Sequence, residues 1–292
     1  MRCLVLSLII NCLHKRISFI FDLHFIFMNK IISCLFLFLL VSSTIFSQKK
    51  SKLPCLDKEF SVVVHIVKDS LGNPGITETS VKGLFGPLNA TFDSICASFK
   101  VCEFRYIDNF MYDTLNQDDK LHFNQLQQQY HAKNRINIYF VTYIRKPKGA
   151  AGFAGLGMIC NMDSDGIVLQ KTASTLTLQH EMGHYFGLNH TWHNKTDIFK
   201  KSEELVNGSN CLTEADDICD TPADPFLKGT DPELYVNQAC RFINSSVDAN
   251  GQYYDPIVGN TMSYYPERCN CGFTHEQYMK MAKTYLSNPT MW

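Results

Sequence analysis

The segment His180–His190, HEMGHYFGLNH, constrains the fold of this chain most, because it places three histidines and one glutamate within eleven residues. On a helix, His180 and His184 would lie on one face, about 6 Å apart along the axis. A helix continued to His190 would carry that residue roughly 15 Å beyond His180, too far for three imidazoles to reach one ion. Gly187 can adopt a left-handed conformation and end the helix, so we expect the chain to turn back there and bring His190 to the other two.

Three neutral imidazoles leave a fourth tetrahedral position open for water, as in a catalytic zinc site. The spacing therefore predicts His180, His184 and His190 as zinc ligands. Glu181 would point about 100° away from His180, so it is predicted to act on the metal-bound water as a general base. The alternative is an amphipathic helix with histidines on its polar face, but five fixed positions in eleven residues are far more specific than a two-histidine motif.

The pattern His-Glu-x-x-His-x-x-Gly-x-x-His resembles the zinc-binding consensus of the metzincins, whose members also carry a methionine turn further along the chain. The stretch GNTMSYYPERC supplies Met262 and, two positions later, Tyr264. The resemblance implies that Met262 forms a hydrophobic floor beneath the zinc and that the Tyr264 hydroxyl lies near the oxyanion of the reaction. Taken alone, Met262 would be ordinary core, and a core aromatic is the alternative for Tyr264.

Three further stretches, NHTW, CLTEADDICDTPADP and CGFTHEQYMKM, together look like the pappalysins, and the resemblance runs from about Phe60 to the C-terminus. The middle stretch departs from the family pattern at Ala215, where a glycine is usual. The resemblance implies calcium, held by the hard oxygen ligands of Asp216, Asp220 and Thr221. The alternative is an Asp-rich solvated turn in which Asp220 caps its own backbone.

The N-terminal region differs from the rest of the chain. Residues 28–47 have a basic start, an apolar run and small residues before a basic stretch, which is typical of a signal peptide. The apolar run is shorter than the roughly 20 residues that a bilayer requires, so no stable membrane span is expected after signal removal. Residues 1–27 are interpreted as mis-assigned upstream translation, 48–59 as a short pre-segment and 60–292 as a metzincin-like catalytic domain. The expected location is extracellular or periplasmic.

The chain has twelve cysteines, and nine of them follow the expected signal, so secretion favours disulfides. The sequence leaves their pairing open. Some relatives keep their zymogens latent with an upstream cysteine whose thiolate binds the zinc, and Cys55 is a candidate for such a latency switch. An ordinary disulfide between Cys55 and the domain is the alternative.

The remaining pattern predicts an α+β fold, with an upper twisted sheet and helices, and a loop-rich lower subdomain with disulfides after His190. Strands are expected at FSVVVHIV, VCEFRYI, RINIYFVTYI and GIVLQ, and a polar helix or loop at LHFNQLQQQYH. A helix is expected over TETSVKGLFGPLNATFDSICASF, interrupted near its start at Gly83, Gly86 and Pro87. One edge strand is expected to be free to pair with an extended peptide. GAAGFAGLGM is expected near that edge, where its glycines would allow close backbone approach by substrate, and a flexible surface loop is the alternative for this segment.

These observations predict a secreted zinc endopeptidase that cleaves proteins or peptides through a glutamate-activated zinc-bound water. The alternative is a catalytically silent zinc-containing binding module, against which the retention of Glu181 counts. The chain is 45% hydrophobic and 19% charged with a net charge of −1, and nothing in this balance indicates a nucleic-acid partner. The residue that follows the cut is left open, because Glu267 would favour a basic residue there and Arg268 an acidic one.

Overall fold

The computed structural model describes residues 51–116, 120–145, 155–158, 166–197 and 199–288. The expected upstream segment and signal peptide lie outside the described residues, as do Cys160 and most of GAAGFAGLGM. The chain divides into Met1–Lys52 and one compact unit, Leu53–Trp292, whose fold is given below. Within the described part of the chain, no helix combines the length and the apolar character that crossing a bilayer requires.

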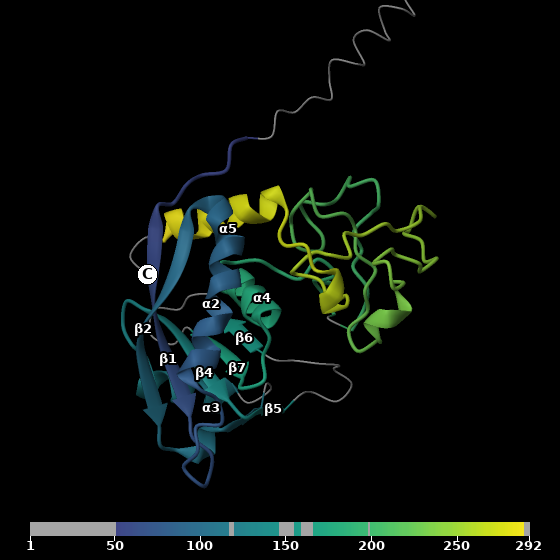
Figure 1. The fold of residues 1–292 in the computed structure, drawn as a ribbon. Coiled ribbons are helices and arrows are strands. Elements are labelled where there is room, and N and C mark those ends of the chain that lie inside the picture. Colours follow the sequence, from purple (N-terminus) through teal and green to yellow (C-terminus); the bar gives the residue numbers. More distant parts are fainter. Residues whose placement is uncertain (1–50, 117–119, 146–154, 159–165, 198, 289–292) are drawn as a thin grey trace, which may run out of the picture. The chain divides into compact units, whose positions relative to one another are not determined.

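A five-stranded sheet with the order β2-β1-β4-β7-β6 forms the first half of this unit (Figure 1). Four strands are parallel, and β6 runs antiparallel to β7 at one edge. A second small sheet pairs β3 with β5. The strand bounds are β1 Lys58–Val67, β2 Ala97–Ile107, β3 Thr114–Asn116, β4 Ile136–Val141, β5 Tyr143–Arg145, β6 Gly155–Met158 and β7 Gly166–Gln170. The four expected strands are all present, with RINIYFVTYI divided between β4 and β5.

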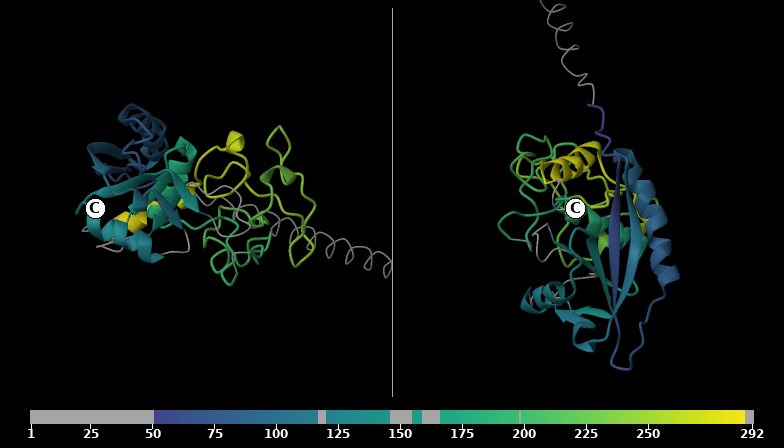
Figure 2. Two further views of the ribbon diagram at one scale, coloured as in Figure 1. Left: turned by 90° about the horizontal axis from the view of Figure 1, so that it is seen from below. Right: turned by 90° about the vertical axis from the view of Figure 1, so that its left-hand side faces the viewer.

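The two faces of the sheet pack against different helices, because successive strand side chains point to opposite faces. In β4, Ile138 and Phe140 join the core that contains α2, α4 and α5, whereas Tyr139 and Val141 join the core beneath α3. Figure 2 shows α2 and α3 on these opposite faces. The helix bounds are α2 Glu78–Phe92, α3 Lys120–Tyr130, α4 Thr175–Tyr185 and α5 His275–Ser287, with 3-10 turns at η1 Asp93–Ile95 and η2 Phe110–Tyr112.

The expected interruption of the first helix is wrong, because α2 continues without a break through Pro87. Proline costs about 3 kcal/mol inside a helix, mainly through its missing N–H and a clash with the preceding turn. Here Pro87 and the carbonyl of Gly83 lie on the exposed face, where water can bind the carbonyl. The opposite face buries Val81, Phe85 and Leu88, so tertiary packing outweighs the local penalty.

The region after α4 is loop-rich, as expected, and is held by disulfides and a small aromatic core. Regular structure between α4 and α5 is limited, within the described residues, to isolated bridges and to the 3-10 turns η3 Pro232–Leu234 and η4 Glu267–Cys269. Two disulfides, Cys211–Cys219 and Cys240–Cys269, close loops there. The core of this region contains Trp192, Phe226, Tyr235, Val236, Tyr265 and Cys269.

Cys55 forms a disulfide with Cys96, with the two Cα atoms 4.9 Å apart. The bond ties the segment before β1 to the residue before β2, beside a backbone hydrogen bond from Leu56 to Ile95. A sulfur in a disulfide has no thiolate to offer to zinc. In this structure the Cys55 sulfur is therefore engaged in a disulfide, as the alternative expected. Of the other described cysteines, Cys102 and Cys271 are unpaired and exposed.

Candidate metal centre

The helix α4 and the turn that follows it bring the histidines of the sequence motif together. Ser174 caps the helix by accepting a hydrogen bond from the backbone N–H of Thr177, and the helix ends at Tyr185. Gly187 follows with a φ of +87°, the left-handed conformation that was expected of it. The N–H of Leu188 then bonds the carbonyl of Gly183, which closes the turn and directs the chain back toward the helix.

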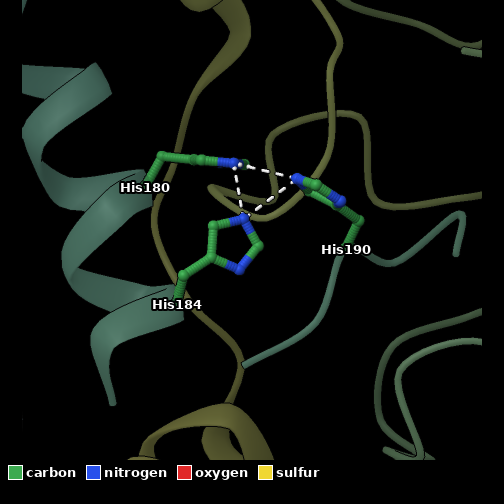
Figure 3. Close-up of side chains that lie close together, drawn as sticks. All are labelled: His180, His184 and His190. Atoms are coloured by element: carbon green, nitrogen blue, oxygen red, sulfur yellow. Dashed lines mark hydrogen bonds between the residues drawn. The ribbon is translucent and has the colours of Figure 1, made fainter. Parts of the chain in front are cut away.

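The Nε2 atoms of His180, His184 and His190 point toward one another (Figure 3). Their separations are 3.1 Å for His180–His190, 3.1 Å for His180–His184 and 3.0 Å for His184–His190. Among the described residues, these three form the group of at least three His, Cys, Asp or Glu side chains whose ligand atoms lie close enough together to share one metal ion. Two of these histidines come from one face of α4, and the third comes from the segment after the turn.

Hydrogen bonds at Nδ1, the ring nitrogen that points away from the cluster, fix the tautomer of two of these histidines. The Nδ1–H of His180 donates to the Thr261 carbonyl at 2.6 Å, and that of His184 donates to the Leu188 carbonyl at 2.8 Å. Burial, together with the charge of His184, lowers the pKa of His180 to about 3, and burial lowers the pKa of His184 to about 4. The pKa of His190 also lies well below its usual value because of burial. The rings are therefore neutral near pH 7, with the Nε2 lone pairs of His180 and His184 directed at the centre of the cluster.

These three residues fit a zinc ion. Tetrahedral coordination with bonds of about 2.0–2.1 Å would place the ligand nitrogens roughly 3.3 Å apart, close to the observed separations. Lone pairs that face one another at this distance repel unless a cation lies between them. Carbonyl partners at Nδ1 are the usual outer contacts of zinc-bound histidines. The donor set and its surroundings therefore match an open three-histidine zinc site.

A cavity of about 460 Å³ lies beside the cluster, and His180, Glu181 and Tyr264 line it. The Glu181 side chain is buried. The Tyr264 ring packs against two of the histidines, with centroid distances of 5.6 Å to His180 and 4.7 Å to His190. Burial, with a smaller contribution from Glu181, raises the pKa of the Tyr264 phenol. The hydroxyl is therefore protonated at neutral pH and can donate a hydrogen bond.

Met262 is fully buried beneath α4. Its position explains why residue 183 of the helix is a glycine, which the sequence alone did not reveal. A Cβ atom added to Gly183 would lie 2.6 Å from Met262 Sδ and 3.1 Å from the ring of Phe273. Only a residue without a side chain lets the methionine turn approach the helix this closely. The signal in the sequence is a glycine placed between His180 and His184, where its low helix propensity costs about 1 kcal/mol relative to alanine.

The structure places the three candidate calcium ligands in one loop, where several of their oxygen atoms already form hydrogen bonds within the protein. Asp216 Oδ1 accepts hydrogen bonds from the Ile218 N–H at 3.2 Å and from the Thr221 hydroxyl at 3.0 Å. Asp220 Oδ2 accepts one from the N–H of Glu276 at 2.9 Å. The other carboxylate oxygens, Asp216 Oδ2 and Asp220 Oδ1, are buried without a hydrogen-bond partner.

A buried glutamate near this loop was not expected from the sequence. Glu204 is 2% exposed, and burial followed by the charge of Asp216 raises its pKa to about 8. Burial also raises the pKa of Asp216 to about 7. Burial therefore makes both carboxyl groups costly to ionise, although the charge of Lys280 partly offsets this cost for Asp216.

The structure distinguishes between the two charged residues after the methionine turn. Arg268 forms a two-pronged ion pair with Glu233, which raises the pKa of the arginine further. Glu267 lines the cavity, where its Oε1 accepts a hydrogen bond from Ser174 at 3.0 Å. The charge of Arg268 is therefore matched by a neighbour, whereas the carboxylate of Glu267 faces the cavity.

This sheet, with three helices on one face, a three-histidine cluster at the end of α4, a methionine turn and a loop-rich lower half, has the fold of the metzincin metallopeptidases. Residues 88–191 match the sequence profile of the reprolysin-like metallopeptidase family M12B, a segment that contains all three histidines and Glu181. This segment is therefore similar in sequence to a metallopeptidase domain.

One solved structure supports the fold, and a second is also similar. Mirolysin in complex with a compound aligns with a TM-score of 0.52 and 16% identity, over 82% of this chain and 95% of that chain. Mature mirolysin of Tannerella forsythia in complex with a cleaved peptide gives a TM-score of 0.48 and 17% identity, over 78% of this chain and 91% of the other. No curated protein sequence matches the chain significantly.

Proposed function

We propose that the protein is a secreted zinc endopeptidase of the pappalysin type that hydrolyses peptide bonds in proteins or peptides. The observation that carries the proposal is the convergence of three neutral imidazole Nε2 atoms beside the buried carboxylate of Glu181, at the edge of one cavity. The three disulfides support an oxidising, extracellular location. Bound zinc would polarise the scissile carbonyl and lower the pKa of a water molecule.

The side chains around the cluster supply the remaining chemistry. His180, His184 and His190 would hold the zinc. Glu181 would take a proton from the attacking water and pass it to the leaving amine, which requires an ionised carboxylate beside the metal. Tyr264 would donate its hydroxyl hydrogen to the oxyanion that forms on the carbonyl carbon. The edge strand β6 would offer backbone groups to an extended substrate.

The proposal is tested on the full chain, expressed with secretion and purified. We expect about one zinc per chain, cleavage of a mixed peptide library, loss of cleavage with 1,10-phenanthroline and its recovery on zinc addition. Zinc binding without cleavage of any peptide or denatured protein would favour the silent binding module instead. Sequencing of the cleavage products would also define the residue preference.

Replacing Tyr264 with phenylalanine should lower kcat by about 10²-fold and change KM little, because the lost hydroxyl acts on the oxyanion and not on the bound substrate. The aromatic contacts with His180 and His190 would be preserved. Steady-state kinetics on one fluorogenic peptide, with zinc content measured in parallel, would check this. An unchanged kcat would leave Tyr264 with a packing role only.

We further propose that Glu267 selects a basic residue after the cleaved bond, since Arg268 is already paired. Glu267→Gln should lower kcat/KM about tenfold for peptides with arginine or lysine at that position and leave neutral peptides little changed. Glu59→Gln, at an exposed position on β1, is the matched control. Equal losses for basic and neutral peptides would rule out a charge-based preference.

We also propose a calcium ion at the loop of Asp216, Asp220 and Thr221. The support is the two buried carboxylate oxygens without partners and the raised pKa values of Glu204 and Asp216. A divalent cation would offset the cost of burying these charges.

Calcium should therefore change how stability depends on pH. The pKa values of Glu204 and Asp216 lie above their unfolded values of 4.5 and 3.8, so the folded state binds protons more tightly. Without calcium, the contribution of these two groups to stability should be fully present below about pH 4 and be lost as the pH rises through about 7 to 8. At 100 times its Kd, calcium should add about 2.7 kcal/mol near pH 8. Thermal melts with calcium or with a chelator would show this, and superimposable curves in both would disprove the site.

A further inference from the structure

Asp224 is a buried carboxylate that the sequence motifs did not single out and that is saturated with hydrogen bonds. The residue is 1% exposed. Its Oδ2 accepts from the hydroxyls of Thr191 at 2.6 Å and Ser263 at 2.8 Å. Its Oδ1 accepts from the hydroxyl of Tyr265 at 2.7 Å and from the backbone N–H of Phe226 at 3.0 Å. Four donors thus occupy the acceptor positions of one carboxylate.

The side-chain partners of Asp224 are the direct neighbours of residues at the metal centre. Thr191 follows His190 in the chain, and Ser263 and Tyr265 stand on either side of Tyr264. The rings of His190 and Tyr264 pack against each other with centroids 4.7 Å apart. One carboxylate therefore joins the segment that carries the third histidine to the segment that carries the tyrosine.

Aromatic contacts of His190 and Trp192 with Tyr264 also join these two segments, but their backbones are weakly connected. Neither belongs to a helix or strand, so no ladder of backbone hydrogen bonds joins them. The backbone bond between them runs from the Thr191 N–H to the Met262 carbonyl at 3.3 Å, which is long. Hydrogen bonds to a buried carboxylate are short and strong, and removing one donor leaves an unsatisfied charge.

From this geometry we infer that Asp224 is a positioning residue for the metal centre: it sets His190 through Thr191, and Tyr264 through Ser263 and Tyr265. The inference rests on the proposed zinc peptidase function, but its first consequence concerns zinc binding and is independent of peptidase activity. It predicts that the hydroxyl at position 191 controls metal affinity, whereas the hydroxyls at 263 and 265 control turnover.

The first experiment compares Thr191→Val with Thr191→Ser in the full chain. Valine keeps the shape of threonine but removes the hydroxyl, whereas serine keeps it. We expect Thr191→Val to weaken zinc binding about tenfold in competition with a chromophoric chelator, and Thr191→Ser to recover most of that loss. The visible spectrum of the cobalt-substituted protein should shift in Thr191→Val, because the third imidazole would be displaced.

The second experiment uses zinc-saturated enzyme. Ser263→Ala and Tyr265→Phe should each lower kcat several-fold with little change in KM or zinc affinity, since they release Tyr264 rather than His190. Asp224→Asn, which exchanges two acceptor sites for an amide donor, should show both defects. Asn137→Ala is the matched control, because it removes buried hydrogen bonds of a β4 residue that do not involve the histidine cluster.

The outcomes separate positioning from simple stabilisation. If Thr191→Val and Asp224→Asn melt at lower temperature, as Asn137→Ala should, but bind zinc and cobalt like the wild type, the inference is wrong. Should Asp224→Asn fail to fold, the variants that each remove one hydroxyl, Thr191→Val, Ser263→Ala and Tyr265→Phe, still test the inference. A wild-type protein that binds zinc but cleaves nothing would refute the proposed function, while the zinc and cobalt measurements would continue to test Asp224.

Discussion

Glu181→Ala should abolish peptidase activity while zinc stays bound. The three histidine ligands are untouched, but the group proposed to move protons between water and leaving amine is gone, and such groups contribute about 10²–10⁴-fold to rate. The loss should appear in kcat and equally in kcat/KM, because the carboxylate acts in the transition state. Glu181 lies at the edge of the cavity, so the smaller side chain leaves room and does not introduce a clash.

The measurement combines kinetics with zinc analysis on the same preparation. Glu59→Ala, an exposed glutamate on β1, serves as the control for removing a negative charge. Glu181→Gln adds a second check, since it keeps the size of the side chain but cannot accept a proton. Zinc-loaded Glu181→Ala with appreciable activity would contradict the role of the general base.

Gly187→Ala should destabilise the fold and weaken zinc binding together. The φ of +87° is unfavourable for any residue with a Cβ, at a cost of about 1–2 kcal/mol. In addition, the new Cβ would lie 2.9 Å from Thr284 Oγ1 on α5. Relief of both strains would open the turn that directs His190 back toward α4, so the third imidazole would be displaced.

Gly72→Ala is a matched control for this variant. Gly72 has a similar φ of +81°, but no atom lies within 4 Å of the position that its Cβ would take. Gly72→Ala should therefore lower the free energy of unfolding only by the cost of the positive φ, and it should bind zinc normally. Denaturant unfolding and chelator competition on both variants would test this, and equal zinc affinities for the two would show that the turn at Gly187 does not set the position of His190.

The interactions that the sequence revealed are those set by local geometry. Helix periodicity relates His180 to His184, and the freedom of glycine at positive φ permits the turn at Gly187, so both could be deduced from a short segment. The strands of the sheet were also predictable, because buried parallel strands need continuous apolar, β-branched runs such as FSVVVHIV.

The continuity of α2 and the pairing of Cys55 depended on tertiary structure. Pro87 and its neighbouring glycines indicated a break, but the break is overridden because the opposite face of the helix is buried against the sheet. The partner of Cys55 depends on how the segments before β1 and β2 meet in space, which no spacing rule gives.

The contacts around the metal centre were likewise decided only by the folded chain. The carbonyl of Thr261, far from His180 in sequence, selects the ring nitrogen that faces the cluster. Glu233 pairs with Arg268, so of the two charged residues after the methionine turn it is Glu267 that presents its charge to the cavity. Asp224 gathers donors from two separate loops. The sequence thus determined which residues could bind a metal, whereas their orientation, tautomer and electrostatic surroundings arise from long-range packing that brings distant backbone and side-chain groups within hydrogen-bond distance.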